Sequence, residues 1–196
     1  MTTKRITTPF RREDARSLRC GQTVLVSGTV YTARDAAHIR LTELIKQGRA
    51  LPFPIENAIL YYVGPTPSAP GRVIGSAGPT TSYRMDAFTP ALIAAGLTGI
   101  IGKGARNHNV VAAMREHGAV YFGAIGGAGA LLARCVESLE IVAYEDLGAE
   151  AIRKLTVRDM PLTVAIDCRG DDLYIQGRKE YLNSGELPVI DERDDH

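Results

Sequence analysis

The sequence predicts a single α/β domain built on a mixed sheet, and two observations carry that prediction. Short β-rich segments alternate with segments whose apolar residues recur at helical spacing, and Gly or Pro separates most of them. The 196 residues are 45% hydrophobic, which suffices for one compact core. We therefore expect one domain over 1–196, with a core at about 6–178 and a solvated acidic tail over 181–196.

The first half of the chain shows alternating strand and helix patterns. The N-terminal 19 residues favour either a basic arm or a strand plus loop that packs on something. Apolar positions 37, 41, 44 and 45 lie on one helical face, which predicts a helix over 34–47 that Gly48 ends. Further elements are expected as strands over 23–31, 58–63 and 72–77, and as a short helix over 90–95 with Thr89 as N-cap.

The second half repeats the alternation, as a mixed sheet requires. Helices are expected from Asn107, as N-cap, to His117 and from Gly126-Gly127 to about Glu137. Strands are expected over 99–102, 119–125, 141–144, 155–157, 162–167 and 173–176, with a hairpin-like turn at 168–172.

Charge and cysteine usage exclude several classes of protein. Lys+Arg number 23 and Asp+Glu 22, and this net charge of +1 provides no basic surplus for nucleic acid or an anionic membrane. Cys20, Cys135 and Cys168 lie far apart, which argues against a disulfide framework and a zinc finger and favours small buried residues. The N-terminus lacks a signal-peptide pattern, and the longest apolar run, 119–133, is too short to span a membrane, so we expect a cytoplasmic protein.

The segment 78–86 (GPTTSYRMD) places Thr80, Thr81 and Ser82 directly after a Gly-Pro corner. Hydroxyl and backbone donors in such a position suit a carboxylate or a phosphate. If the segment is helical, Arg84 lies one turn beyond Thr80 on the same face, where its guanidinium can grip an anion beside the hydroxyl. From spacing alone, a capping cluster with a surface arginine is an equally good interpretation.

Two other loops supply cations. Lys103 lies between two glycines after an apolar strand, which allows close approach to an anion, although a solvated lysine is the more common meaning of this pattern. Arg34 and His38 are four residues apart at a helix start, where the arginine suits an anion and the histidine suits acid–base chemistry. The alternative is a surface pair of Arg34 with Asp35 and a histidine that fills a partly buried position.

The glycine-rich segment 123–129 (GAIGGAG) lacks the residue order of a nucleotide-binding loop, so its glycines favour close packing of backbone against a neighbour or a ligand. Taken together, the cationic loops and their hydroxyls predict part of a site for a small dianion. None of these clusters contains a cysteine or an evident metal site. The electrophile that a reaction of the dianion would require is therefore expected to come from outside these loops.

Four motifs, in this order and spacing, resemble the class I (iron–sulfur) fumarate hydratases, specifically their C-terminal domain or separate β subunit. These motifs are ARDAAH at 33–38, GPTTSYRMD at 78–86, IGKG at 101–104 and AIGGAGALLA at 124–133. The L(+)-tartrate dehydratase β subunit is a close relative of that family. The resemblance covers roughly residues 6–178, and its specific part is GPTT-x-x-RM[DE] combined with the downstream KG.

The resemblance implies a swivelling β/β/α fold and a reversible addition of water to a C4 dicarboxylate, fumarate to (S)-malate. It also implies a partner α subunit, in an α2β2 heterotetramer, that holds a [4Fe–4S] cluster through three cysteines and leaves one iron open as a Lewis acid. This chain itself is expected to hold no metal and to be active only with that partner.

The resemblance also implies roles for individual residues. Arg34, Arg84 and Lys103 match residues that bind the substrate carboxylates, and Thr81 and Ser82 belong to the same substrate-binding loop. Thr80 matches the threonine proposed as catalytic base. His38 is the reserve candidate for that base, and both it and Asp35 lie in the matching motif.

Tyr83 stands where many fumarases have a smaller residue, which favours a narrower site or a related diacid as substrate. The alternatives within the lyase class are an L(+)-tartrate dehydratase β subunit and a mesaconate-type hydratase. The alternative from another class is a stand-alone module that binds a dicarboxylate or a phosphate.

Overall fold

A computed structural model describes residues 3–124 and 128–183. The strands are β1 (Lys4–Thr7), β2 (Thr23–Thr32), β3 (Ile59–Tyr61), β4 (Gly99–Gly102), β5 (Val120–Gly123), β6 (Val136–Ala143) and β7 (Ile152–Ile166). The α-helices are α1 (Arg12–Arg16), α2 (Asp35–Lys46), α3 (Thr89–Ala94), α4 (His108–His117), α5 (Gly129–Arg134) and α6 (Leu173–Asn183). Two 3-10 helices are η1 (Ser82–Met85) and η2 (Glu145–Glu150).

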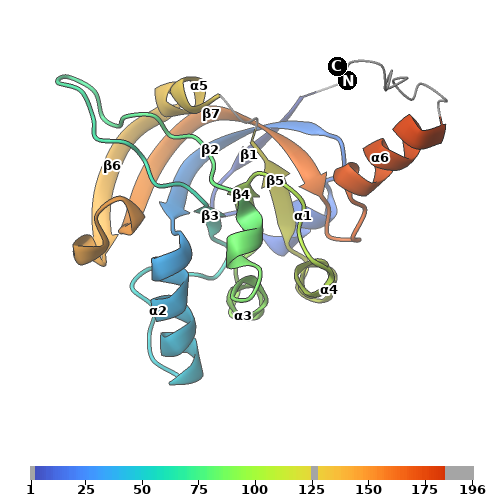
Figure 1. Cartoon of the computed structure of the whole chain (residues 1–196), viewed down its shortest axis with the longest axis horizontal. Coiled ribbons are helices and arrows are strands. Elements are labelled where there is room, and N and C mark those ends of the chain that lie inside the picture. Colours follow the sequence, from blue (N-terminus) through green and yellow to red (C-terminus); the bar gives the residue numbers. More distant parts are fainter. Residues whose placement is uncertain (1–2, 125–127, 184–196) are drawn as a thin grey trace, which may run out of the picture.

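The strands form one sheet of seven strands, and it is mixed, as expected. β1 to β5 are parallel neighbours in chain order, while β7 runs antiparallel to β2, β5 and β6. Because β7 pairs with both β2 and β5, the strands β2, β3, β4, β5 and β7 close into a ring. Helices α2, α3 and α4 lie on one side of β3, β4 and β5, and β6 and β7 arch over the other side of these strands (Figure 1). The result is a β/β/α arrangement of layers.

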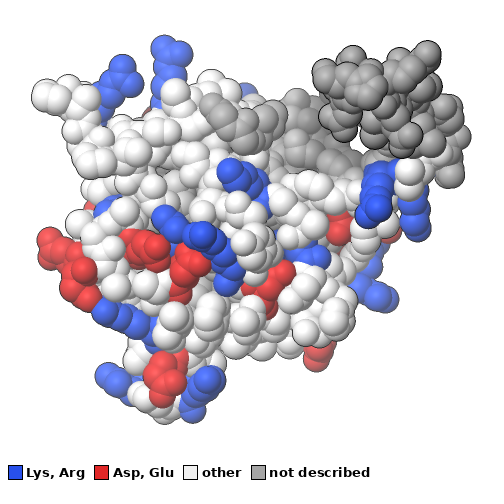
Figure 2. All heavy atoms as spheres, in the orientation of Figure 1, with Lys and Arg blue, Asp and Glu red and all other residues white. Residues whose placement is uncertain are grey.

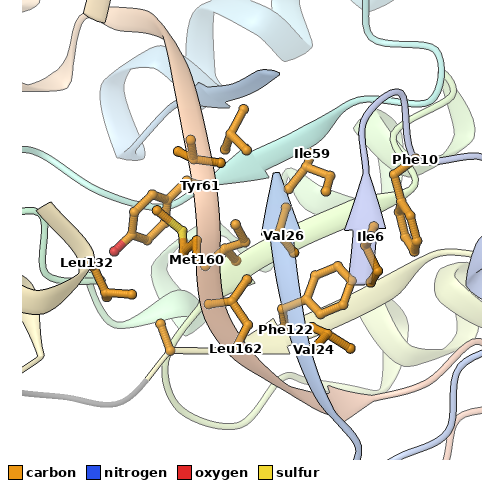
Figure 3. Packing of buried hydrophobic residues seen from close by; sticks show 14 of the residues in the cluster. Ile6, Phe10, Val24, Val26, Ile59, Tyr61, Phe122, Leu132, Met160 and Leu162 are labelled. Atoms are coloured by element: carbon orange, nitrogen blue, oxygen red, sulfur yellow. The ribbon is translucent and has the colours of Figure 1, made fainter. Parts of the chain in front are cut away.

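Alternation of side chains along the central strands divides the core in two. Ile59, Tyr61 and Phe122 point into a cluster between the two strand layers. Leu60 and Tyr121, from the same strands, point into a second cluster under the helices. Figure 3 shows how side chains from several strands gather in the first cluster. Both faces of these strands are therefore buried, as is usual for parallel strands.

Several predicted elements are confirmed with small shifts of their ends. The strand at Gly99–Gly102 is found as expected, and Asn107 caps α4, since its side chain accepts a hydrogen bond from Val110 N at 3.0 Å. The N-terminal region forms β1, as the strand-plus-loop alternative expects, but helix α1 follows the strand. Close backbone packing is found at Gly129, where a Cβ would lie 3.0 Å from Gly78 N. The predicted helix start at Gly126-Gly127 and the tail beyond residue 183 lie outside the described residues.

Two predicted strands are wrong, and two others belong to one longer strand. Residues 72–77 are irregular, in a loop whose ends meet where Thr66 N donates to Ser76 O at 3.1 Å. The segment 173–176 is the start of α6, because the Asp172 carboxylate accepts from Tyr174 N at 2.8 Å and so caps a helix. The two strands expected over 155–157 and 162–167 are one continuous β7 that runs through Pro161.

Three boundaries also differ. β6 begins at Val136, earlier than expected, and α5 ends at Arg134 instead of about Glu137. Thr89 is the first residue of α3 and not its N-cap, because its hydroxyl donates to Met85 O at 2.8 Å. No helix of the described residues is long and apolar enough to cross a membrane.

Candidate active site

The predicted site residues follow the carboxyl ends of three neighbouring parallel strands. Arg34 comes two residues after β2, the loop that contains Thr80 follows β3, and Lys103 follows β4 directly. Parallel neighbours end at the same edge of a sheet, which is where open α/β sheets bind ligands. The structure therefore places these residues along one edge.

Backbone hydrogen bonds attach the 78–86 loop to this edge. Thr80 N donates to Tyr62 O at 2.8 Å, and Ser82 N donates to Lys103 O at 3.0 Å. A bridge between Thr81 and Lys103 continues this pairing. The hydroxyl-bearing loop and the glycine-flanked lysine, which are far apart in the sequence, are thus direct neighbours.

The local shape of the loop differs from the helix considered for it. A single 3-10 turn begins at Ser82, so Thr80 lies outside it and does not share a helical face with Arg84. Arg84 is exposed and forms no ion pair with any described residue. Thr80, Thr81 and Lys103 are half-buried. All four are open to a ligand at the surface.

Ser82 has a different environment from its neighbours. Its side chain is fully buried, and its hydroxyl accepts from Lys103 N at 3.1 Å and from the Tyr121 hydroxyl at 2.9 Å. A Cβ at Gly102 would lie 2.0 Å from Ser82 Oγ, so the glycine makes this contact possible. The hydroxyl of Ser82 holds the loop against the end of β4 and does not face solvent.

Arg34 lies in a corner between β2, the end of β3 and the hairpin that joins β6 to β7. Its Nη2 atom lies 3.4 Å from Asp35 Oδ2 and 3.3 Å from Glu150 Oε1. A Cβ at Gly64 would lie 3.0 Å from its Nη1 atom. Figure 2 shows basic and acidic groups gathered over this region, near the N-terminal end of α2. The expected Arg34–Asp35 pair is present, and a second acid joins it.

His38 is enclosed in the core beneath this corner. It is 0% exposed, its Nδ1 lies 2.8 Å from Arg34 O, and its ring meets that of Tyr62 edge-on. A neutral ring that donates through Nδ1 leaves Nε2 without a partner among the described residues. Burial is the main reason that the pKa of His38 is lowered to about 4, and the charge of Arg106 lowers it further. The histidine is therefore neutral at pH 7.

Sequence reasoning missed a buried ion pair that supports the site. Arg106 Nε donates to Asp86 Oδ1 at 2.6 Å, and its Nη2 donates to the Thr89 hydroxyl at 2.8 Å. Its guanidinium lies between the rings of Tyr62 and Tyr121, 5.3 and 5.1 Å from their centroids. We call this set the Arg106 cluster; it joins the end of the 78–86 loop to the segment after Lys103. Asp86 stands in the GPTTSYRMD motif, but no local pattern marks Arg106 as buried.

The described residues contain no group of three or more His, Cys, Asp or Glu side chains arranged to hold a metal ion. All three cysteines are free and half-buried, which corrects the expectation of full burial. Burial, followed by the nearby Asp167, raises the pKa of Cys20 to about 11, so its thiol stays protonated at pH 7.

Comparison with known proteins now identifies the family. The model of the fumarase C-terminus family matches residues 2–177. The chain belongs to the fumarase C-terminus family. Its relatives include the class I anaerobic fumarate hydratase of Escherichia coli K12, which is 42% identical over 153 residues, 77% of this chain. A putative L(+)-tartrate dehydratase β subunit of Methanocaldococcus jannaschii is 35% identical over 183 residues, 90% of this chain.

The relatives differ in how much of their length the chain covers. It spans 28% of the Escherichia coli enzyme and 34% of a putative class I fumarate hydratase of Geobacillus stearothermophilus, to which it is 32% identical. It spans 94% of the Methanocaldococcus jannaschii β subunit.

The Arg106 cluster gives a prediction for stability. Asp86→Ala should lower the free energy of unfolding by about 3–5 kcal/mol, because it leaves the wholly buried Arg106 without its counter-ion. Urea unfolding measures this loss. Asp146→Ala, which removes the partner of the exposed Arg40, is the matched control and should cost much less. Equal losses in the two variants would contradict the assignment.

The buried histidine gives a prediction for pH dependence. Unfolded His38 takes up a proton near pH 6.5 but the folded residue only near 4, so folding stability falls as pH drops through this window. Between pH 7.5 and 5 this difference should remove about 2 kcal/mol from the free energy of unfolding. Urea titrations at both pH values should show a smaller loss in His38→Asn than in wild type. The control, His108→Asn in the exposed first turn of α4, should behave as wild type, and equal losses in all three would contradict the prediction.

Proposed function

We propose that this chain is the β subunit of a two-subunit hydro-lyase that hydrates fumarate reversibly to (S)-malate. One observation carries the proposal: Arg34, Arg84, Lys103 and the hydroxyl of Thr80 follow neighbouring strand ends at one edge of the sheet. A C4 dicarboxylate is a dianion, and binding it requires several cationic donors held in place. The family membership and the near full-length match to a β subunit support the same function.

In the proposed reaction, this chain binds and orients the carboxylates and handles one proton. Addition of water places a hydroxyl group on one alkene carbon and a proton on the other, and dehydration of malate removes that proton. Thr80 is the proposed base, and its half-buried place at the sheet edge favours it over the enclosed His38. A threonine hydroxyl is weakly acidic, so the neighbouring cations must stabilise its deprotonated form.

We propose that a partner α subunit carries the [4Fe–4S] cluster through three cysteines of its own, in an α2β2 heterotetramer. Two features support this division: the described residues offer no metal-ligand group, and Arg84 and Tyr83 are exposed, Tyr83 to 65%. A cationic site so open to solvent lacks the enclosure that excludes water from a reaction. The partner would close the site.

The exposed residues Tyr83 and Arg84 also bear on which diacid the proposed enzyme hydrates. Tyr83, beside Arg84, would lie in the wall of the closed site, and the alternative substrates are L(+)-tartrate and a methyl-substituted diacid such as mesaconate. The name of the Methanocaldococcus jannaschii relative supports tartrate as the first alternative. The alternative to an enzyme subunit is a stand-alone module that binds a dicarboxylate or a phosphate.

Co-expression with a three-cysteine α subunit tests the proposed function. The assembled protein should hydrate fumarate in an oxygen-sensitive manner, and this chain alone should show no turnover. Assays with fumarate, L(+)-tartrate and mesaconate in parallel distinguish the substrates. Robust turnover by the chain alone, without iron, would overturn the two-subunit proposal, and tight calorimetric binding of fumarate by the chain alone would favour the module.

The cationic residues give a quantitative prediction. In the assembled enzyme, Arg84→Ala and Lys103→Ala should each lower kcat/KM by a factor on the order of 100 or more, because each removes a charged donor from the dianion. Lys46→Ala, at the exposed far end of α2, is the matched control and should retain wild-type kinetics. Circular dichroism melts should show all three variants folded. Wild-type kinetics in both site variants would remove these cations from the site.

A further inference from the structure

A glutamate from the β6–β7 hairpin reaches the start of α2. Glu150 is the last residue of η2, and its Oε2 atom accepts a hydrogen bond from Ala36 N at 2.9 Å. Its other oxygen, Oε1, lies 3.3 Å from Arg34 Nη2, and the side chain is only 24% exposed. One carboxylate thus contacts both a backbone donor of α2 and the guanidinium that precedes the helix.

The two acids around Arg34 leave most of its donors free. Asp35 and Glu150 both approach Nη2, at 3.4 and 3.3 Å. No described residue hydrogen-bonds to Nη1, and Nε is buried without a partner. The acids therefore hold one corner of the guanidinium and leave Nη1, beside Gly64, available to a ligand.

The hairpin that carries Glu150 is itself braced. Arg153 donates to Gly148 O at 2.7 Å and to Ala149 O at 3.0 Å, and Arg40 forms an ion pair with Asp146. Glu150 is therefore supplied by a segment tied to both β7 and α2. A carboxylate held in this way has little freedom to swing toward or away from Arg34.

We propose that Glu150 is a positioning residue for Arg34: it fixes the guanidinium so that Nη1 faces the substrate carboxylate. The proposal rests on the proposed function, because it takes Arg34 as a carboxylate-binding residue. The opposite role for the same contact is competition, in which Glu150 occupies Arg34 and must be displaced by the substrate. The two roles predict changes of opposite sign when the charge is removed.

Glu150→Gln is the deciding variant, because its amide oxygen still accepts the hydrogen bond from Ala36 N while the charge is lost. In the co-expressed enzyme, KM for fumarate should rise about tenfold with kcat changed less than threefold, since Arg34 binds the ground state and the transition state alike. Glu145→Gln, an exposed position in the same η2, is the matched control and should leave both constants unchanged. An unchanged or lower KM in Glu150→Gln would overturn the positioning role.

A double-mutant cycle separates action through Arg34 from a general structural effect. In an Arg34→Met background, Glu150→Gln should change KM less than twofold, because the group that it positions is gone. A tenfold rise that persists in this background would show that Glu150 acts through the fold of the hairpin, and this result too would overturn the proposal.

A measurement on the 196-residue chain keeps this test independent of the reaction. NMR can follow hydrogen exchange at Arg34 Nε, whose signal is assigned by its absence in Arg34→Lys. This exchange should be at least tenfold faster in Glu150→Gln than in wild type or Glu145→Gln. Equal exchange rates would overturn the positioning role even if the enzyme is active. Faster exchange in a chain whose complex hydrates no diacid would instead leave the positioning role supported and refute the proposed function.

Discussion

Burial of the central strands on both faces is the constraint on which the site depends. In β3, β4 and β5 one set of side chains fills the space between the strand layers and the alternate set packs under α2, α3 and α4. Polar groups on either face would lose hydration without a partner, at a cost of several kcal/mol each. Polar chemistry is thereby confined to the strand ends. Because β2, β3 and β4 are parallel, Arg34, Thr80 and Lys103 reach the same end.

The Arg106 cluster is a charged exception to this largely apolar interior, and its position explains why it is tolerated. Arg106 and Asp86 lie between the 78–86 loop and the start of α4, where Asp86 also accepts a hydrogen bond from Asn107 N at 2.8 Å. An ion pair so deeply buried is a weak source of net stability, because desolvation offsets the attraction. Its effect is geometric: it adds a charged side-chain link between two loops that backbone hydrogen bonds and the Ser82 hydroxyl also join. The exposed Arg84 and the half-buried Lys103 thus stand on a supported frame.

The sequence predicted the mixed sheet and the loops that the structure places along one of its edges, since both follow from local patterns. The apolar segment Gly99–Gly102 predicted β4, and Asn107 before a segment with helical spacing of apolar residues predicted α4. Failures arose where tertiary contacts override such patterns. The β-prone residues Tyr174 and Ile175 lie in a helix because Asp172 caps it, and Pro161 does not interrupt β7. The burial of Arg106 and the approach of Glu150 to Arg34 depend on contacts between distant segments, which no spacing rule reveals.

The cations near this edge of the sheet are of two kinds, those paired with acids and those without such a partner among the described residues. The net charge of +1 does not reveal this difference. Arg106 is neutralised by Asp86, and Arg34 is surrounded by Asp35 and Glu150, so neither adds free positive charge at the edge of the sheet. Arg84 and Lys103 form no ion pair with any described residue, so each retains its free positive charge. In the proposed site, two uncompensated cations would match the two carboxylates of a dianion. Arg34 would then contribute directed hydrogen-bond donors more than charge, and its orientation would matter more than its distance from other cations.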